Sequence, residues 1–303
     1  MQKSSPKGII FLLLTAIIWG SSFVAQSVGA EVLEPFSYNG IRTVMGAIFL
    51  AVFIIIKELA QKHTLKGIID RKLLIRGTIL GLIFTFASNF QQFAFLDSSA
   101  GKIAFITAFY LFFVPLIGLF MRRHIHPLIW LCIFTAIFGL YLLSVKGGDF
   151  SNISRGDIFA LICAFFFAIH ILTVDKFVQE SDGVKLSCVQ FAVAGTITLI
   201  LVSIFEHPTV SAVKSAAIPL LYSGIMSCGI AYTFQIVGQK HTNPITASLL
   251  MSLESVFAVL AAALILKEVP TLREGIGCIV IFASIIVSQI VEIKCKAPSN
   301  SSC

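Results

Sequence analysis

Charged residues are scarce in this chain of 303 residues. Only 12% of them are Asp, Glu, Lys or Arg, whereas a soluble domain of this length carries roughly a quarter. Hydrophobic residues make up 57%, and the mean hydropathy is +0.95. So few charges exclude a soluble globular surface, and lipid must be the main solvent. The net charge of +7 is spread over short loops, so we expect no nucleic-acid partner.

The motifs of enzymes, pumps and metal sites are missing as well. The seven cysteines stand singly, without C-x-x-C or Cys/His spacing, which excludes a zinc site or a disulfide framework. The chain has no H-E-x-x-H, G-x-S-x-G or Walker A sequence. Asp157 and Asp175 stand at opposite ends of one apolar stretch and cannot form a catalytic pair. We therefore expect no enzyme, no cofactor and no ATP-driven transport by this chain alone.

Long apolar stretches fill the chain instead. A bilayer core of about 30 Å needs about 20 apolar helical residues. Glycine, proline and charged residues mark the boundaries, with Pro35, Pro244 and Pro270 at span starts, and Pro115 is expected to kink or loosen span four. The predicted spans are 8–28, 35–56, 73–96, 102–121, 127–145, 156–176, 186–205, 216–238, 243–266 and 270–292.

The chain begins twice in the same way. KGIIFLLLTA at 7–16 is echoed by RGDIFALICA at 155–164, with Gly, Ile, Phe, Leu and Ala in register. This echo predicts five-helix repeats at 7–146 and 155–293, followed by a short tail at 294–303. Five is odd, so the second repeat enters the membrane inverted, an architecture that places a carrier's substrate site between the repeats. The predicted fold is an all-α membrane protein with ten transmembrane helices in two inverted five-helix repeats.

Lysines and arginines gather in the loops of one side. If the N-terminus is cytoplasmic, most of them fall in cytoplasmic loops and ends, which is the bias that sets membrane topology. We therefore expect both termini in the cytoplasm of a multi-pass integral protein, in a bacterial inner (plasma) membrane. The expected assembly is a monomer or a weak homodimer.

Several segments carry a family resemblance. Trp19-Gly20-Ser21-Ser22-Phe23 resembles the W-G-S/T-x-F signature of the drug/metabolite transporter superfamily, in its EamA-type branch. Segments 38–42, 104–108 with Pro115, and 252–257 resemble that family too. The resemblance implies alternating access to a central cavity and small substrates such as amino acids, nucleosides or drugs, often exported. Ser255 departs from the family, which commonly has proline there, so we expect a straighter span nine.

Glu254 and Arg42 are the charged residues predicted at membrane depth. Glu254 lies about ten residues, or roughly 15 Å, past Pro244. An unpaired carboxylate there costs on the order of 3 kcal/mol, so it is protonated, paired or bathed by water. It is a candidate for the coupling proton or for a cationic substrate group. Arg42 is a candidate for an anionic substrate, for pairing with Glu254, or for helix packing. Gln190 stands at the equivalent position of the second repeat.

Other polar and aromatic side chains form stripes at helical spacing. Thr15, Trp19 and Ser22 share a face of span one, and Asn89 and Gln92 share a face of span three. Such stripes line a cavity or join helices. The small residues of the spans, Gly20, Gly46, Gly139, Gly195 and Gly224 among them, are assigned to helix packing. The candidate substrate-binding residues are Trp19, Ser22, Asn89, Gln92, Tyr110, His170, Tyr232 and Gln235.

These observations favour a secondary carrier for a small molecule, embedded in a lipid bilayer. The predicted site lies between spans one, three and four and spans six, eight and nine, and protons are the candidate coupling ion. A non-transporting membrane receptor or scaffold of the same fold remains the alternative.

Overall fold

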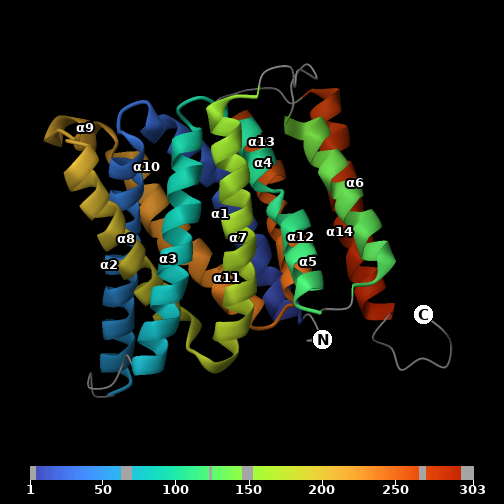
Figure 1. Ribbon diagram of the computed structural model, residues 1–303, viewed down its shortest axis with the longest axis horizontal. Helices are drawn as coiled ribbons and strands as arrows, with labels where there is room; N and C mark the ends of the chain where they lie inside the picture. The colour runs from blue at the N-terminus through green and yellow to red at the C-terminus, as the bar shows by residue number, and fades with distance from the viewer. Residues whose placement is uncertain (1–4, 63–69, 123–124, 145–152, 266–270, 295–303) are drawn as a thin grey trace.

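The computed structural model describes residues 5–62, 70–122, 125–144, 153–265 and 271–294, and all regular elements in these ranges are helices (Figure 1). In chain order they are α1 (Pro6–Ala30), α2 (Pro35–Ala60), α3 (Arg71–Ala94), α4 (Ala100–Thr107), α5 (Tyr110–Phe120), α6 (Pro127–Ser144), α7 (Arg155–Phe177), η2 (Val178–Glu180), α8 (Gly183–Phe205), α9 (Val210–Ser215), α10 (Ala217–Leu221), η3 (Tyr222–Ala231), α11 (Tyr232–Gln239), α12 (Pro244–Met251), α13 (Glu254–Ile265) and α14 (Leu272–Lys294).

The predicted membrane spans agree with these helices. Within the described ranges, nine helical segments are long and apolar enough to cross a membrane, and Pro127–Leu142 is a shorter apolar helix. The chain is therefore an all-α membrane protein with about ten membrane helices. Pro35 and Pro244 open α2 and α12 as predicted, where an absent N–H leaves no helical bond unmade. Pro270 lies outside the described residues.

Span four is interrupted, as Pro115 predicts. The chain turns at Ala108 and Phe109, between α4 and α5. There the Leu111 N–H bonds back only three residues, to the Ala108 carbonyl at 3.0 Å. Pro115 has no N–H for the Leu111 carbonyl four residues before it, so the first turn of α5 is short of a helical bond. The interruption itself lies upstream of Pro115, at a position that the sequence did not predict.

Span nine is interrupted too, so the expectation of a straighter span is wrong. Its two helices, α12 and α13, are separated by Ser252 and Leu253 although Ser255 stands where a proline was expected. The Ser252 hydroxyl donates to the Leu249 carbonyl at 2.8 Å, and the Ser248 hydroxyl donates to the Ile245 carbonyl at 2.8 Å. Serine hydroxyls that bond to the preceding turn bend helices. Two such bonds lie immediately before the interruption of span nine, where no proline is present.

Span eight departs from α-helical geometry in its middle. It consists of α10, the ten-residue π-helix η3, and α11, all joined without a break. The Tyr232 N–H bonds to the Ser227 carbonyl, five residues back. Segments of π-helix are rare and frequently occur at functional sites. The span predicted at 216–238 is confirmed as a continuous helical segment, Ala217–Gln239, but the π-helix changes which of its residues share a face.

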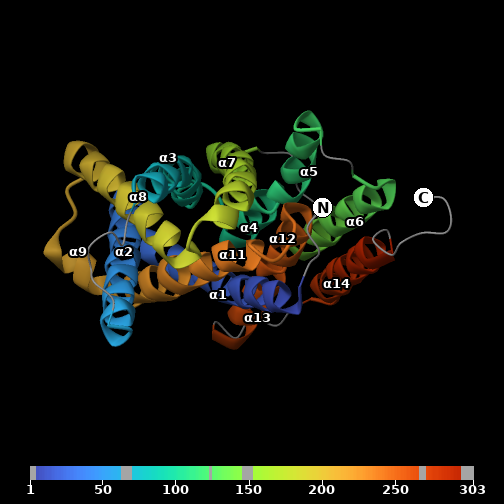
Figure 2. The same cartoon turned by 90° about the horizontal axis from the view of Figure 1, so that it is seen from below.

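The helices of the two halves of the chain pack against one another. The main pairs are α2 with α8, α6 with α14, α1 with α13 and α3 with α7, each joining one helix from either half. The pairs α2/α8 and α6/α14 lie at opposite ends of the elongated molecule (Figures 1 and 2). Helices α1, α3, α4, α7, α11 and α13 lie between these end pairs. The middle of the molecule is therefore built from both halves.

Glycines set the closest approaches between these helices. A Cβ atom on Gly20 would lie 2.6 Å from the Phe257 Cβ atom and 2.7 Å from the Glu254 carbonyl oxygen. A Cβ atom on Gly46 would lie 2.6 Å from the Cys228 Cβ atom. Gly139, Gly195 and Gly224 are equally crowded, which confirms the packing role predicted for them. The first two glycines bring α1 onto α13 and α2 onto η3.

Polar contacts tie α2 to α8 at both of their ends. The Glu206 carboxylate, just after α8, accepts hydrogen bonds from the Phe36 N–H at 2.9 Å and the Ser37 N–H at 2.6 Å. It thereby caps the first turn of α2, where N–H groups lack helical partners. At the other end of α8, the Lys185 ammonium pairs with the Glu58 carboxylate at 2.8 Å. These links fasten the two halves of the chain together at one end of the molecule.

Candidate functional site

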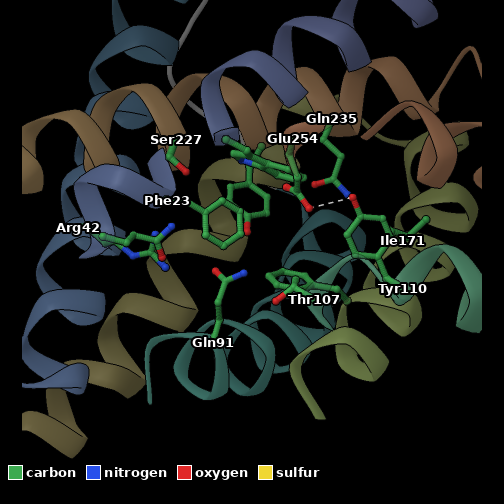
Figure 3. Close-up of a pocket in the computed structure, with 13 residues that line it drawn as sticks. Phe23, Arg42, Gln91, Thr107, Tyr110, Ile171, Ser227, Gln235 and Glu254 are labelled. Carbon is green, nitrogen blue, oxygen red and sulfur yellow. Dashed lines mark hydrogen bonds between the residues drawn. The ribbon is translucent and has the colours of Figure 1, made fainter. Parts of the chain in front are cut away.

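A cavity lies in the middle of the molecule, between helices α1 to α5 of the first half and α7, η3, α11 and α13 of the second (Figure 3). It contains about 420 Å³ of space free of protein atoms, part of which is open to solvent. Helices from both halves of the chain form its wall, as the sequence predicted for a carrier. The lining residues are Trp19, Phe23, Gln26, Arg42, Gln91, Thr107, Tyr110, Phe167, Ile171, Ser227, Tyr232, Gln235 and Glu254.

The two interrupted spans meet at one side of this cavity. Tyr110 is the first residue of α5 and Glu254 is the first residue of α13, so each follows the interruption of its span. The Tyr110 hydroxyl donates to Glu254 Oε1 at 3.0 Å, which is the dashed line in Figure 3. The Tyr110 side chain is 2% exposed and that of Glu254 is 3% exposed. A buried carboxyl group is thus held on the wall by a neutral donor.

The opposite side of the cavity holds Arg42 (Figure 3). Its Nε atom donates to Asn39 Oδ1, one turn earlier in α2, at 2.9 Å. Its guanidinium also lies 5.9 Å from the centre of the Tyr38 ring, a cation–π contact. Pairing with Glu254, one of the three alternatives for Arg42, is not formed in this structure, because among the described residues no carboxylate forms an ion pair with Arg42. The cavity therefore separates a cationic side from an acidic side.

Aromatic rings form the apolar part of the wall. The Tyr232 ring lies 4.5 Å from the Trp19 ring and 5.0 Å from the Phe84 ring, measured between centroids. The Phe167 ring stacks on Tyr232 at 6.4 Å. Tyr232 is therefore the centre of an aromatic cluster that joins α1, α3, α7 and α11. Rings in such mutual contact present a rigid apolar surface to a bound molecule.

Several polar atoms on this wall are buried without a hydrogen-bond partner. They are Trp19 Nε1, Gln26 Oε1, Thr107 Oγ1, Gln235 Oε1 and Arg42 Nη2. The Gln235 side chain keeps one bond, from its amide nitrogen to Gln239 Oε1 at 3.1 Å. Buried polar groups are paired in most proteins, so a cluster of unpaired ones needs an explanation. A ligand with polar groups of its own supplies one.

Six of the residues predicted for the site line the cavity: Trp19, Arg42, Tyr110, Tyr232, Gln235 and Glu254. On span eight, Tyr232 and Gln235 line the cavity, whereas Gln239 lies behind the wall and donates to the Ile171 carbonyl at 3.0 Å. Thr15 likewise joins helices, since its hydroxyl donates to the Ala231 carbonyl at 3.0 Å.

The other four predicted residues, Ser22, Asn89, Gln92 and His170, lie off the cavity wall. Asn89 bonds to Asn39 at 2.8 Å and to Thr198 at 3.1 Å, which joins α2, α3 and α8. His170 Nε2 is 2.7 Å from Gln190 Oε1, a contact between α7 and α8. Both form hydrogen bonds between helices because their faces point at neighbouring helices rather than at the cavity. Ser22 and Gln92 are fully buried.

Sequence reasoning missed several lining residues. Gln26 continues the stripe of Trp19 and Ser22 by four residues, so a longer stripe would have included it. Gln91 adjoins the chosen Gln92 in a run of amides, which the helical period alone cannot resolve. Ser227 belongs to the π-helix and could not be placed by α-helical spacing. Phe23, Thr107, Phe167 and Ile171 carry no signal that distinguishes them from packing residues.

Comparisons with known proteins follow the same division of the chain. The model of the EamA-like transporter family matches residues 6–145 and again residues 154–289. An uncharacterized transporter of Archaeoglobus fulgidus is 26% identical over 91% of this chain and 83% of its own length. The uncharacterized transporter YoaV of Bacillus subtilis is 25% identical over 93% of this chain and 96% of its own length.

A crystal structure of a protein with 17% sequence identity superposes with a TM-score of 0.77, over 97% of this chain and all of that one. At this identity the superposition shows the fold alone.

Proposed function

Because this chain belongs to the EamA-like transporter family and is a multi-pass membrane transporter, we propose that it is a secondary exporter of a small metabolite, amino acid or drug. The substrate binds in the central cavity, and the two halves of the chain expose it to each side of the membrane in turn. Protons supply the driving force through Glu254. The transporter acts as a monomer or a weak homodimer.

The cavity carries this proposal. Its wall takes residues from spans one to four and from spans six, eight and nine, so movement between the halves would change which side it opens to. Buried unpaired polar atoms and an aromatic cluster on one wall match the needs of a small solute with both polar and apolar parts.

Glu254 is the proposed proton site because a membrane carboxyl group in a cavity can gain and lose a proton as access changes. Tyr110, its hydrogen-bond partner, is a neutral donor from the other half of the chain. A shift between the halves would alter this bond, and with it the environment of the carboxyl group. Binding of a proton and movement of the halves are thereby coupled.

The topology is part of the proposal. Repeats at 7–146 and 155–293 are supported by the two matches of one family model to the chain. We place the second repeat inverted relative to the first, and both termini, with the tail 294–303, in the cytoplasm. The excess of lysine and arginine on one side supports this orientation. The proposed membrane is the bacterial inner (plasma) membrane.

The test is counterflow in proteoliposomes that contain the full chain. A substrate is first found by screening metabolites and drugs for thermal stabilisation of the purified protein. Labelled substrate should then accumulate transiently and saturably against unlabelled substrate inside the vesicles. If no screened compound shows counterflow, the transport proposal fails and the receptor or scaffold alternative takes its place.

The proton site is tested by Glu254→Gln. We expect this variant to retain counterflow at equal pH and to lose flux driven by a pH gradient, because an amide cannot exchange a proton. The matched control is Glu180→Gln, whose side chain is 71% exposed and far from the cavity wall, and which should leave both rates unchanged. A folded Glu254→Gln variant with intact pH-driven flux would contradict proton coupling at this residue.

A further inference from the structure

One cationic side chain on the cavity wall has no charged partner. Arg42 is 1% exposed, and its Nη2 atom has no hydrogen-bond partner. Among the described residues, no Asp or Glu forms an ion pair with it. A buried charge without a counter-ion is strongly unfavourable. An anion that enters the cavity would therefore gain the interaction that the protein itself leaves unmade.

A network of neutral side chains holds this guanidinium in place. Asn39 accepts the Arg42 Nε hydrogen bond, and its own amide donates to Ser88 Oγ at 3.0 Å and Asn89 Oδ1 at 2.8 Å. Asn89 donates onward to Thr198 Oγ1 at 3.1 Å. These groups orient the arginine without neutralising it. Figure 3 shows the guanidinium directed into the cavity, toward Phe23 and Gln91.

We propose that Arg42 binds the carboxylate of a small organic monoacid whose apolar body lies against the aromatic wall. The inference rests on the proposed function, since it names the substrate class of the same cavity. A guanidinium offers a planar pair of donors that matches a carboxylate. The apolar body would contact the rings of Trp19, Phe23 and Phe167, which line the cavity.

The charges of the site select against other anions. A phosphate ester carries nearly two negative charges at neutral pH, and Arg42 is the single Lys or Arg among the residues that line this cavity. A dicarboxylate would bring its second charge toward Glu254, on the opposite side (Figure 3). Either ligand would leave a negative charge buried without a partner. A single carboxylate balances the single guanidinium.

The experiment measures binding of acids against their neutral amides. The full chain in lipid nanodiscs is titrated with acetate, butyrate, benzoate, phenylacetate and indole-3-acetate, and with the amide of each acid. The amide has nearly the same shape but no charge. We expect the aromatic acids to bind about tenfold or more tightly than their amides, which is the factor that a hydrogen bond to a charged group supplies.

Arg42→Gln should abolish this preference for acids, because the acids would lose a charge-assisted hydrogen bond and the amides only a weaker neutral one. The matched control is Arg76→Gln, because Arg76 pairs with Glu180 away from the cavity. A second variant provides a test that does not depend on correct folding of Arg42→Gln. Asn39→Asp keeps the arginine and gives it a buried counter-ion of almost the same size, so this variant should also lose the preference for acids.

Equal binding of acids and amides, or an unchanged preference in Arg42→Gln and Asn39→Asp, would overturn the inference. The transport proposal would survive that result if neutral or cationic compounds still show counterflow. Conversely, acid binding that depends on Arg42 in a protein without counterflow would support this site and end the proposal of transport.

Discussion

Spans four and nine have the same form and reach it by different means. Each consists of an eight-residue helix, a two-residue interruption and a longer helix. The first residue after the interruption is Tyr110 in one span and Glu254 in the other, and these residues are hydrogen-bonded to each other. The residues that follow the two interruptions therefore meet at one side of the cavity. One supplies a neutral donor and the other an acid.

The local chemistry near the two interruptions differs. Span four contains Pro115, which removes a helical hydrogen bond by its chemistry. Span nine contains no proline after Pro244 within its described part, and the hydroxyls of Ser248 and Ser252 bond to the preceding turn instead. Similar backbone shapes thus occur in two spans whose local sequences differ. Both spans have the same backbone shape, but the first residue after the interruption differs in its chemistry, with Tyr110 in one span and Glu254 in the other.

The two interruptions also differ in the helices that pack against them. The start of α13 lies against α1 at Gly20, whereas α4 and α5 lie against α7. We expect Gly20→Leu to have the largest effect on stability, a loss of about 3 kcal/mol or more, because the new side chain would displace the backbone of α13 at Glu254. Thermal unfolding of the purified protein measures it.

Gly275→Leu is the matched control for that variant. A Cβ atom on Gly275 would meet nothing within 4 Å, so this substitution in α14 should change the unfolding temperature little. Equal destabilisation by the two variants would show that leucine is harmful for reasons other than the close approach at Gly20.

Tyr110→Phe should have an intermediate effect. It removes the one donor that the Glu254 carboxyl group receives from span four, at a cost of about 1–3 kcal/mol for a buried group left unpaired. The variant should also respond more weakly to a pH gradient in the flux assay. Tyr222→Phe is the control, since its hydroxyl contacts Ser21 at a partly exposed position. Wild-type stability and coupling in Tyr110→Phe would mean that the two spans do not communicate through this bond.

The serines of span nine should have the smallest effect on stability. Ser248→Ala with Ser252→Ala is expected to change the free energy of unfolding by less than about 1 kcal/mol, while the amides of 252–256 exchange more slowly with deuterated water as the helix straightens. Thr135→Ala is the control, because Thr135 makes the same kind of bond, to the Leu131 carbonyl, in the continuous helix α6. Unchanged exchange at 252–256 would assign the interruption to packing instead.

Much of the fold could be read from the sequence because lipid imposes a simple rule on it. A membrane span must be a helix of about 20 apolar residues, so the boundaries at Pro35 and Pro244 and the short break after α3 were visible in the residues. Crowded glycines such as Gly20 and Gly46 were recognisable for the same reason, since small residues mark helix contacts in lipid.

The sequence by itself determined the number of spans, the membrane setting and a pool of polar residues that must face inward. Only the tertiary structure decided which of them share the cavity. His170 and Asn89 turn to helix neighbours, while Arg42 and Glu254 reach the same space from different halves of the chain. Helical spacing defines a face within one span, but the direction of that face depends on how helices rotate and break. In this protein, packing between the halves and the π-helix of span eight set those rotations.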